Sequence, residues 1–60
     1  MLLIETKYGN FGKLENVLRF MKEENLKEIE FTKVEYCLDE IVGKGIYTIQ
    51  QIEKATQNQN

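Results

Sequence analysis

The chain has 60 residues and a formal net charge of −2, with one cysteine and no histidine. A chain of this length forms one domain with a small core, and its cysteine and histidine content excludes an internal disulfide and a Cys/His zinc site. No apolar run approaches the roughly 20 residues of a membrane span. The N-terminus also lacks the basic start and apolar core of a signal peptide, so we expect a cytoplasmic protein.

The first predicted element is a short strand within residues 1–8, whose even-numbered positions from Leu2 to Tyr8 share one face. The sequence Gly-Asn-Phe-Gly at 9–12 is typical of a turn, because glycine and asparagine tolerate positive φ. Asn10 is a candidate cap for the helix that follows.

A helix is predicted over residues 13–24. Its apolar side chains recur at i, i+3, i+4 and i+7, and they are Leu14, Val17, Leu18 and Met21. Asn25 is expected to end this helix in the left-handed conformation, with Leu26 folding back on Met21 as in a Schellman ending. Residues 27–31 then form an extended connector or an edge strand beside the N-terminal strand.

The next segment carries two helix-start patterns. Thr32 stands three residues before Glu35, which is the spacing of a capping box, and predicts a helix over 33–42. Phe31 and Tyr36 would form a hydrophobic staple around this cap.

The same pattern recurs at Thr48 and Gln51, with Tyr47 and Ile52 as its staple, and predicts a last helix over 49–56. Residues 43–47 would connect the two helices, since glycine at position 43 stops the first of them.

These elements predict an α+β fold that is mostly helical: an N-terminal strand followed by three short helices, the last two in a helix-loop-helix arrangement. The alternative is β-α-β-β, with a hairpin at Gly43–Gly45 before a strand over 46–49. In that alternative the alternation through 28–36 slips by one residue at Thr32, so a continuous strand needs a bulge there.

We expect one domain over residues 1–56 and a disordered polar tail over 57–60. The predicted core is apolar and draws on every predicted element. Its members are Leu3, Ile4, Leu14, Val17, Leu18, Met21, Ile29, Phe31, Val34, Leu38, Ile41, Ile49 and Ile52.

The residue types argue against catalysis. Without histidine and with a single cysteine, the usual nucleophile–base pairs are missing. Cys37 falls on an apolar stripe among acidic neighbours, which disfavour a thiolate, so we expect it to pack in the interior. Neither an EF-hand loop nor a phosphate-binding loop is present. We therefore expect no enzyme activity, no cofactor and no metal ion.

The preferred functional prediction is a small accessory or regulatory protein that binds another protein or itself, most simply as a homodimer. A chain this short has little interior, so apolar residues beyond the core indicate an interface. The candidate interface residues are Tyr36, Cys37, Val42, Ile46 and Tyr47.

The alternative is a minimal helix-turn-helix DNA-binding regulator. Its last helix would offer base- and phosphate-contacting side chains, namely Gln50, Gln51, Lys54 and Gln57. The charge distribution disfavours nucleic acid, because residues 23–42 carry seven acidic residues against two basic ones.

Overall fold

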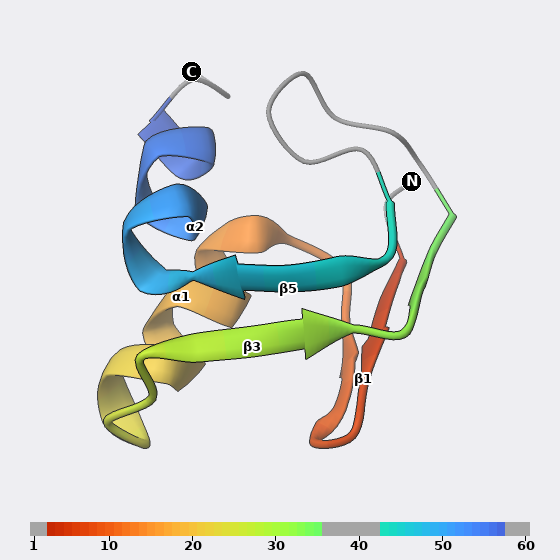
Figure 1. Cartoon of the computed structure of the whole chain (residues 1–60), viewed down its shortest axis with the longest axis horizontal. Helices are drawn as coiled ribbons and strands as arrows, with labels where there is room; N and C mark the ends of the chain where they lie inside the picture. The colour runs from red at the N-terminus through yellow and green to blue at the C-terminus, as the bar shows by residue number, and fades with distance from the viewer. Residues whose placement is uncertain (1–2, 36–42, 58–60) are drawn as a thin grey trace.

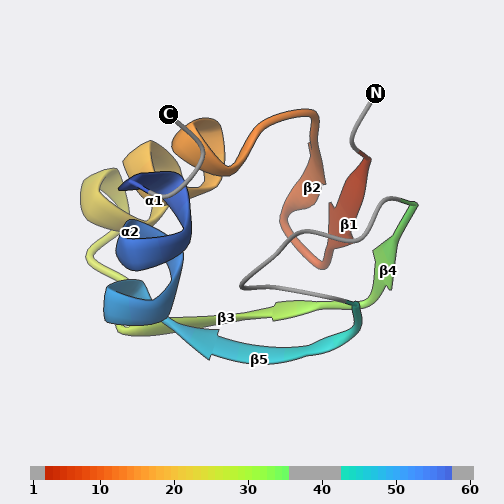
Figure 2. The ribbon, with the colours of Figure 1, turned by 90° about the horizontal axis from the view of Figure 1, so that it is seen from above.

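The computed structural model of the chain describes residues 3–35 and 43–57, which form two antiparallel sheets and two helices. The sheets have the strand orders β2-β1-β4 and β3-β5. The two helices lie side by side at one end, and the β1–β2 hairpin stands at the other (Figure 1 and Figure 2). In chain order the elements are β1 (Ile4–Thr6), β2 (Gly9–Phe11), α1 (Leu14–Glu23), β3 (Glu28–Phe31), β4 (Lys33–Val34), β5 (Gly45–Thr48) and α2 (Ile49–Gln57).

The predicted mostly helical fold is wrong, because the described residues form two helices and five strands, and the start of the expected second helix is a strand. Residues 33 and 34 are β4, which pairs antiparallel with β1. The Thr32 hydroxyl does not cap a helix: it donates to the carbonyl oxygen of Glu5 at 3.0 Å. The pairing with β1 therefore overrides the local capping pattern, and the helix-loop-helix arrangement is lost. Residues 36–42 of the predicted helix lie outside the described residues.

The β-α-β-β alternative predicts the last strand correctly but predicts the wrong connection to its partner strand. The predicted strand over 46–49 exists as β5, yet Gly43–Gly45 is not a hairpin loop. Gly45 itself belongs to β5 and lies opposite Phe31, because the partner of β5 is β3. The connection between these two strands therefore spans residues 32–44 and contains β4.

The slip in alternation at Thr32 marks the passage of the chain from one sheet to the other. Lys33 pairs with Glu5 in the register of β1 and β4. The backbone N–H of Thr32 also donates to the carbonyl oxygen of Glu5, at 2.8 Å. Thr32 and Lys33 therefore both lie opposite the single residue Glu5, and this two-to-one pairing defines a β-bulge. The bulge turns the strand out of the β3–β5 pair and into the sheet of β1 and β2, as Figure 2 shows.

The first helix is confirmed, and its C-terminus has the predicted Schellman geometry. Asn25 has a φ of 58°, and the N–H of Leu26 donates to the carbonyl of Met21 at 2.8 Å. Its N-terminus differs from the prediction. Lys13 occupies the cap position with no side-chain hydrogen bond, whereas Asn10 lies in β2.

The last helix is confirmed together with its capping box. The hydroxyl of Thr48 accepts from the N–H of Gln51 at 3.2 Å, and the side-chain oxygen of Gln51 accepts from the N–H of Thr48 at 2.8 Å. These two bonds satisfy N–H groups that the first turn of a helix leaves without partners.

The core is formed by β1, β3 and one face of each helix. Eight apolar side chains are buried: Ile4, Leu14, Val17, Met21, Ile29, Phe31, Ile52 and Ala55. The first seven belong to the predicted core, and Ala55 extends the apolar stripe of α2. Leu18, Val34 and Ile49 pack against this cluster while partly exposed. The predicted core residues Leu38 and Ile41 lie outside the described residues.

Candidate functional site

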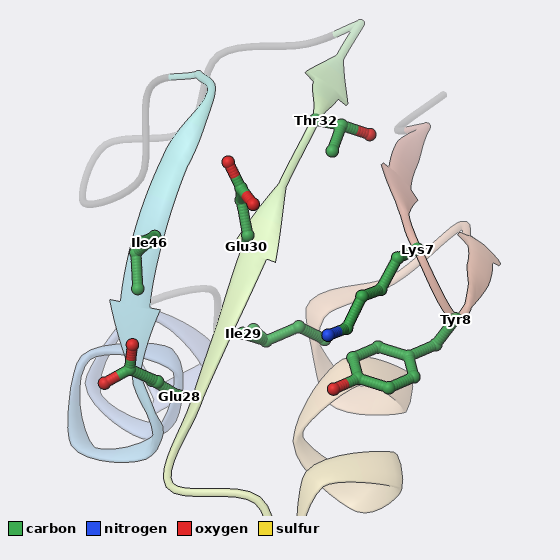
Figure 3. Close-up of a pocket in the computed structure, with 7 residues that line it drawn as sticks. All are labelled: Lys7, Tyr8, Glu28, Ile29, Glu30, Thr32 and Ile46. Atoms are coloured by element: carbon green, nitrogen blue, oxygen red, sulfur yellow. The ribbon is translucent and has the colours of Figure 1, made fainter.

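A cavity of about 270 Å³ opens between the turn of the β1–β2 hairpin and the outer side of the β3–β5 pair (Figure 3). We call it the hairpin groove. One wall comes from the turn and the other from strands far away in the sequence. The lining residues are Lys7, Tyr8, Glu28, Ile29, Glu30, Thr32 and Ile46.

The wall at the hairpin is a turn over residues 7–8, held by the side chain of Thr6. The hydroxyl of Thr6 accepts from the N–H of Tyr8 and donates to the carbonyl of Gly9, both at 3.0 Å. Gly9 has a φ of 136°, which an L side chain rarely adopts. The turn was expected at residues 9–12, but Gly9–Phe11 instead forms β2 and pairs with β1. Thr6 and Gly9 therefore fix the position of Lys7 and Tyr8.

The Tyr8 ring packs against Phe20, which in turn packs against Phe11. Its centroid lies 5.3 Å from that of Phe20, which lies 5.5 Å from Phe11. The amine of Lys7 lies 5.2 Å from the Tyr8 centroid, within the range of a cation–π interaction. The ring is thus held in place while 44% of Tyr8 remains exposed.

The opposite wall follows from the alternation of side chains in β3 and β5. Ile29 and Phe31 point into the core, so Glu28 and Glu30 point outward. Ile46 pairs with Glu30 across the two strands and shares its outward direction, which leaves Ile46 61% exposed. An apolar side chain and two carboxylates therefore stand on the outer face of this pair.

One edge of β3 faces the hairpin groove. The N–H of Ile49 donates to the carbonyl of Lys27 at 2.9 Å, which makes this pair the hydrogen-bonded type. Such pairs alternate along an antiparallel ladder, so the backbone groups of Ile29 also bond to β5. The backbone groups of Glu28 and Glu30 point to the other edge, toward the hairpin. Within the described part of the chain, the backbone groups of Glu28 and Glu30 make no hydrogen bond to another backbone group at this edge.

The candidate interface residues of the sequence fall into three groups. Ile46 is exposed and lines the groove. Tyr47 faces inward, with its ring 5.0 Å from Phe31 and its hydroxyl donating to the carbonyl of Gly43 at 2.9 Å. The other three, Tyr36, Cys37 and Val42, lie outside the described residues.

The groove residues at the hairpin and on β3 were missed from the sequence. Tyr8 was assigned to one strand face with the core residues, because the turn was expected two residues later. Residues 27–31 were expected to form a connector or an edge strand beside the N-terminal strand. Glu28–Phe31 is a strand, but its partner is β5 and not β1.

The four side chains proposed for DNA contact, Gln50, Gln51, Lys54 and Gln57, are exposed on α2. The Gln51 side chain is engaged in the capping box. Beside Lys54, the acidic Glu53 forms an ion pair with Lys22 of α1 at 3.8 Å. The helix that should precede α2 in a helix-turn-helix is replaced at its start by β4, so α2 has no such companion there.

Lys33 of β4 forms a small charge network with two carboxylates. The amine of Lys33 lies 3.2 Å from Glu35 and 3.9 Å from Glu5. The hydrogen bond to Glu35 and the negative charges of both carboxylates raise the pKa of Lys33 above its ordinary value. This network lies on exposed side chains, so screening by water keeps its contribution to stability small.

Two properties hold for residues 3–35 and 43–57 as a whole. No group of three or more His, Cys, Asp or Glu side chains there is placed to hold a metal ion. Neither helix has the length and apolarity required to cross a membrane. Comparisons of the chain with protein-family models, with curated proteins and with solved structures found no match.

Proposed function

We propose that the protein is a non-enzymatic protein-binding module and that the hairpin groove is its binding site. One observation carries this proposal. Two large apolar residues in the described part of the chain are exposed, Tyr8 and Ile46, and both line the same cavity from opposite walls. They come from segments 38 positions apart in the numbering, so the fold itself brings them to one place.

The surroundings of these two residues match the composition of a protein interface. Interfaces combine an apolar centre, rich in aromatic side chains, with a polar rim. Here Tyr8 and Ile46 supply the apolar part, while Lys7, Glu28 and Glu30 supply charged side chains beside it. The cavity is small and open to solvent, so it suits one or two side chains of a larger partner.

The charge of the groove supports a protein partner over nucleic acid. Phosphate binding depends on clustered lysine and arginine side chains. The groove has two carboxylates and a single lysine, whose amine already lies over the Tyr8 ring. A phosphate backbone laid along β3 would meet Glu28 and Glu30.

Selection from a library of random displayed peptides tests the proposal without knowledge of the partner. The library is selected on the wild-type protein and on the double variant Tyr8→Ser/Ile46→Thr, in which threonine keeps the strand preference of position 46. The control is Gln50→Ser/Gln57→Ser, which changes two exposed residues of α2. Far-ultraviolet circular dichroism establishes that all three proteins are folded.

We expect a set of peptides that is enriched on the wild type and on the control but lost on the groove variant. Enrichment that is equal on all three proteins, or absent from all three, would refute the hairpin groove as a protein-binding site.

A further inference from the structure

We infer that the hairpin groove takes its partner as an added β-strand, paired to the free edge of β3, and that it selects the sequence basic–apolar–basic. This inference rests on the proposed function and names the mode of binding and the chemical class of the partner segment.

The first step concerns the edge of β3. At Thr32 this edge is occupied, because its N–H donates to Glu5 of β1. β1 then ends at Thr6 and the chain turns back, so β1 is too short to continue along β3. The backbone groups of Glu30 and Glu28 follow in the same direction and face the groove. An extended segment placed there would continue the line of β1, antiparallel to β3, and its main chain would supply the hydrogen bonds.

The second step concerns charge. Residues directly opposite each other in an antiparallel pair point to the same face and interact. Partner residues opposite Glu28 and Glu30 would therefore project beside two carboxylates on the outer face. Basic side chains at these two positions, separated by one residue, are complementary to them.

The third step concerns the residue between the two basic ones. It would lie opposite Ile29 and share the inward direction of that buried side chain. Figure 3 shows Ile29 reaching toward the hairpin, on the side where Tyr8 lies. An apolar residue such as valine matches this environment.

In the free protein, the side chain of Lys7 lies in the groove beside the free edge of β3. It reaches from the turn into the groove, in the direction of Ile29 in the view of Figure 3. Lysine at a strand edge discourages unspecific pairing with other chains. Because Lys7 is exposed, a partner segment can displace its side chain.

The partner class is a different protein and not a second copy. Nowhere in this sequence are two lysine or arginine residues separated by a single residue. The chain itself therefore lacks the basic–apolar–basic pattern that its groove selects.

The test uses end-capped synthetic peptides with the sequence Thr-Arg-Val-Arg-Thr and the charge-reversed Thr-Glu-Val-Glu-Thr, titrated into the full chain and followed by nuclear magnetic resonance. We expect the basic peptide to bind about tenfold more tightly, from two cross-strand charge pairs. Exchange of the amide protons of Glu28 and Glu30 should slow about tenfold at saturation. The variant Glu28→Lys/Glu30→Lys should reverse the preference.

Two methylated peptides separate strand pairing from charge attraction alone. In the antiparallel arrangement the arginine N–H groups point to β3 and the valine N–H points away. N-methylation of either arginine should abolish binding, whereas N-methylation of the valine should leave it unchanged.

Equal effects of the methylated peptides, or no binding of the basic peptide to the wild type, would overturn strand addition. The proposed function would survive this result if displayed peptides still depend on Tyr8 and Ile46, and it would fall separately if none do.

Discussion

Replacement of Thr48 by valine isolates the energetic contribution of one capping hydroxyl. Thr48 is the last residue of β5 and stands directly before α2, where its hydroxyl accepts from Gln51 at 3.2 Å. Valine has the same branched shape and a higher strand preference, so the strand does not suffer from the change. The hydroxyl alone is lost, and the N–H of Gln51 loses its acceptor. Loss of such a cap costs about 1 kcal/mol.

In a domain of this size, a loss of 1 kcal/mol lowers the Tm by roughly 4–8 °C. We expect Thr48→Val to show this decrease in thermal unfolding followed by circular dichroism at fixed protein concentration. Thr48→Ser keeps the hydroxyl and serves as the matched control, with a Tm close to that of the wild type. Gln51→Ala removes the other half of the box and should cost less. A valine variant as stable as the wild type would show that the capping box does not stabilise α2.

Three further predictions concern stability and assembly. At Asn25, whose φ is 58°, Asn25→Gly should be neutral or stabilising, whereas Asn25→Ala should lose about 1 kcal/mol in urea unfolding; equal effects would contradict the left-handed ending. The raised pKa of Lys33 means that its ion pairs stabilise the fold below pH 10.5 and that this stabilisation is lost as the pH rises through the folded-state pKa. The wild type should therefore be more stable than Lys33→Met at pH 8, and this difference in unfolding free energy should disappear once the pH exceeds the folded-state pKa of Lys33. The homodimer expected from the sequence stays a prediction: the Tm should rise with protein concentration, and a monomer at on the order of 100 µM in sedimentation equilibrium would contradict it.

The two capping patterns explain which part of the fold is readable from the sequence. Thr48 with Gln51 and Thr32 with Glu35 have the same spacing, and both predict a helix. Only the first forms one. At Thr32 the decisive partner is Glu5, which lies 27 positions away and whose carbonyl accepts from both the N–H and the hydroxyl of Thr32. Local patterns contain no information about such a distant strand, whereas the helix ending at Asn25 depends on its immediate neighbours alone.

The site was predictable only in part, for the same reason. Ile46 was named as an interface residue because the core has no place for every apolar side chain; it is exposed, and its role in an interface stays a prediction. Tyr8 depends on the position of a turn, and the pairing of Thr6 with Gly9 places that turn earlier than the glycine and asparagine residues indicate. Tyr47 directly follows Ile46 in β5. Because side chains alternate along a strand, Tyr47 points toward the core whereas Ile46 points outward.

The bulge at Thr32 links the fold to the proposed binding mode. Without the extra residue, β3 and β4 would run as one regular strand, and the side chains beyond Thr32 would keep the alternation that places Phe31 in the core. With it, the strand bends into the sheet of β1, whose hairpin then diverges from β3 instead of lying along it. Bulges are common at sheet edges and next to functional sites, where they terminate pairing. Here the termination leaves the backbone of Glu28 and Glu30 at an edge bounded by Tyr8. The same one-residue irregularity that misleads a helix prediction therefore produces the edge to which we assign the partner strand.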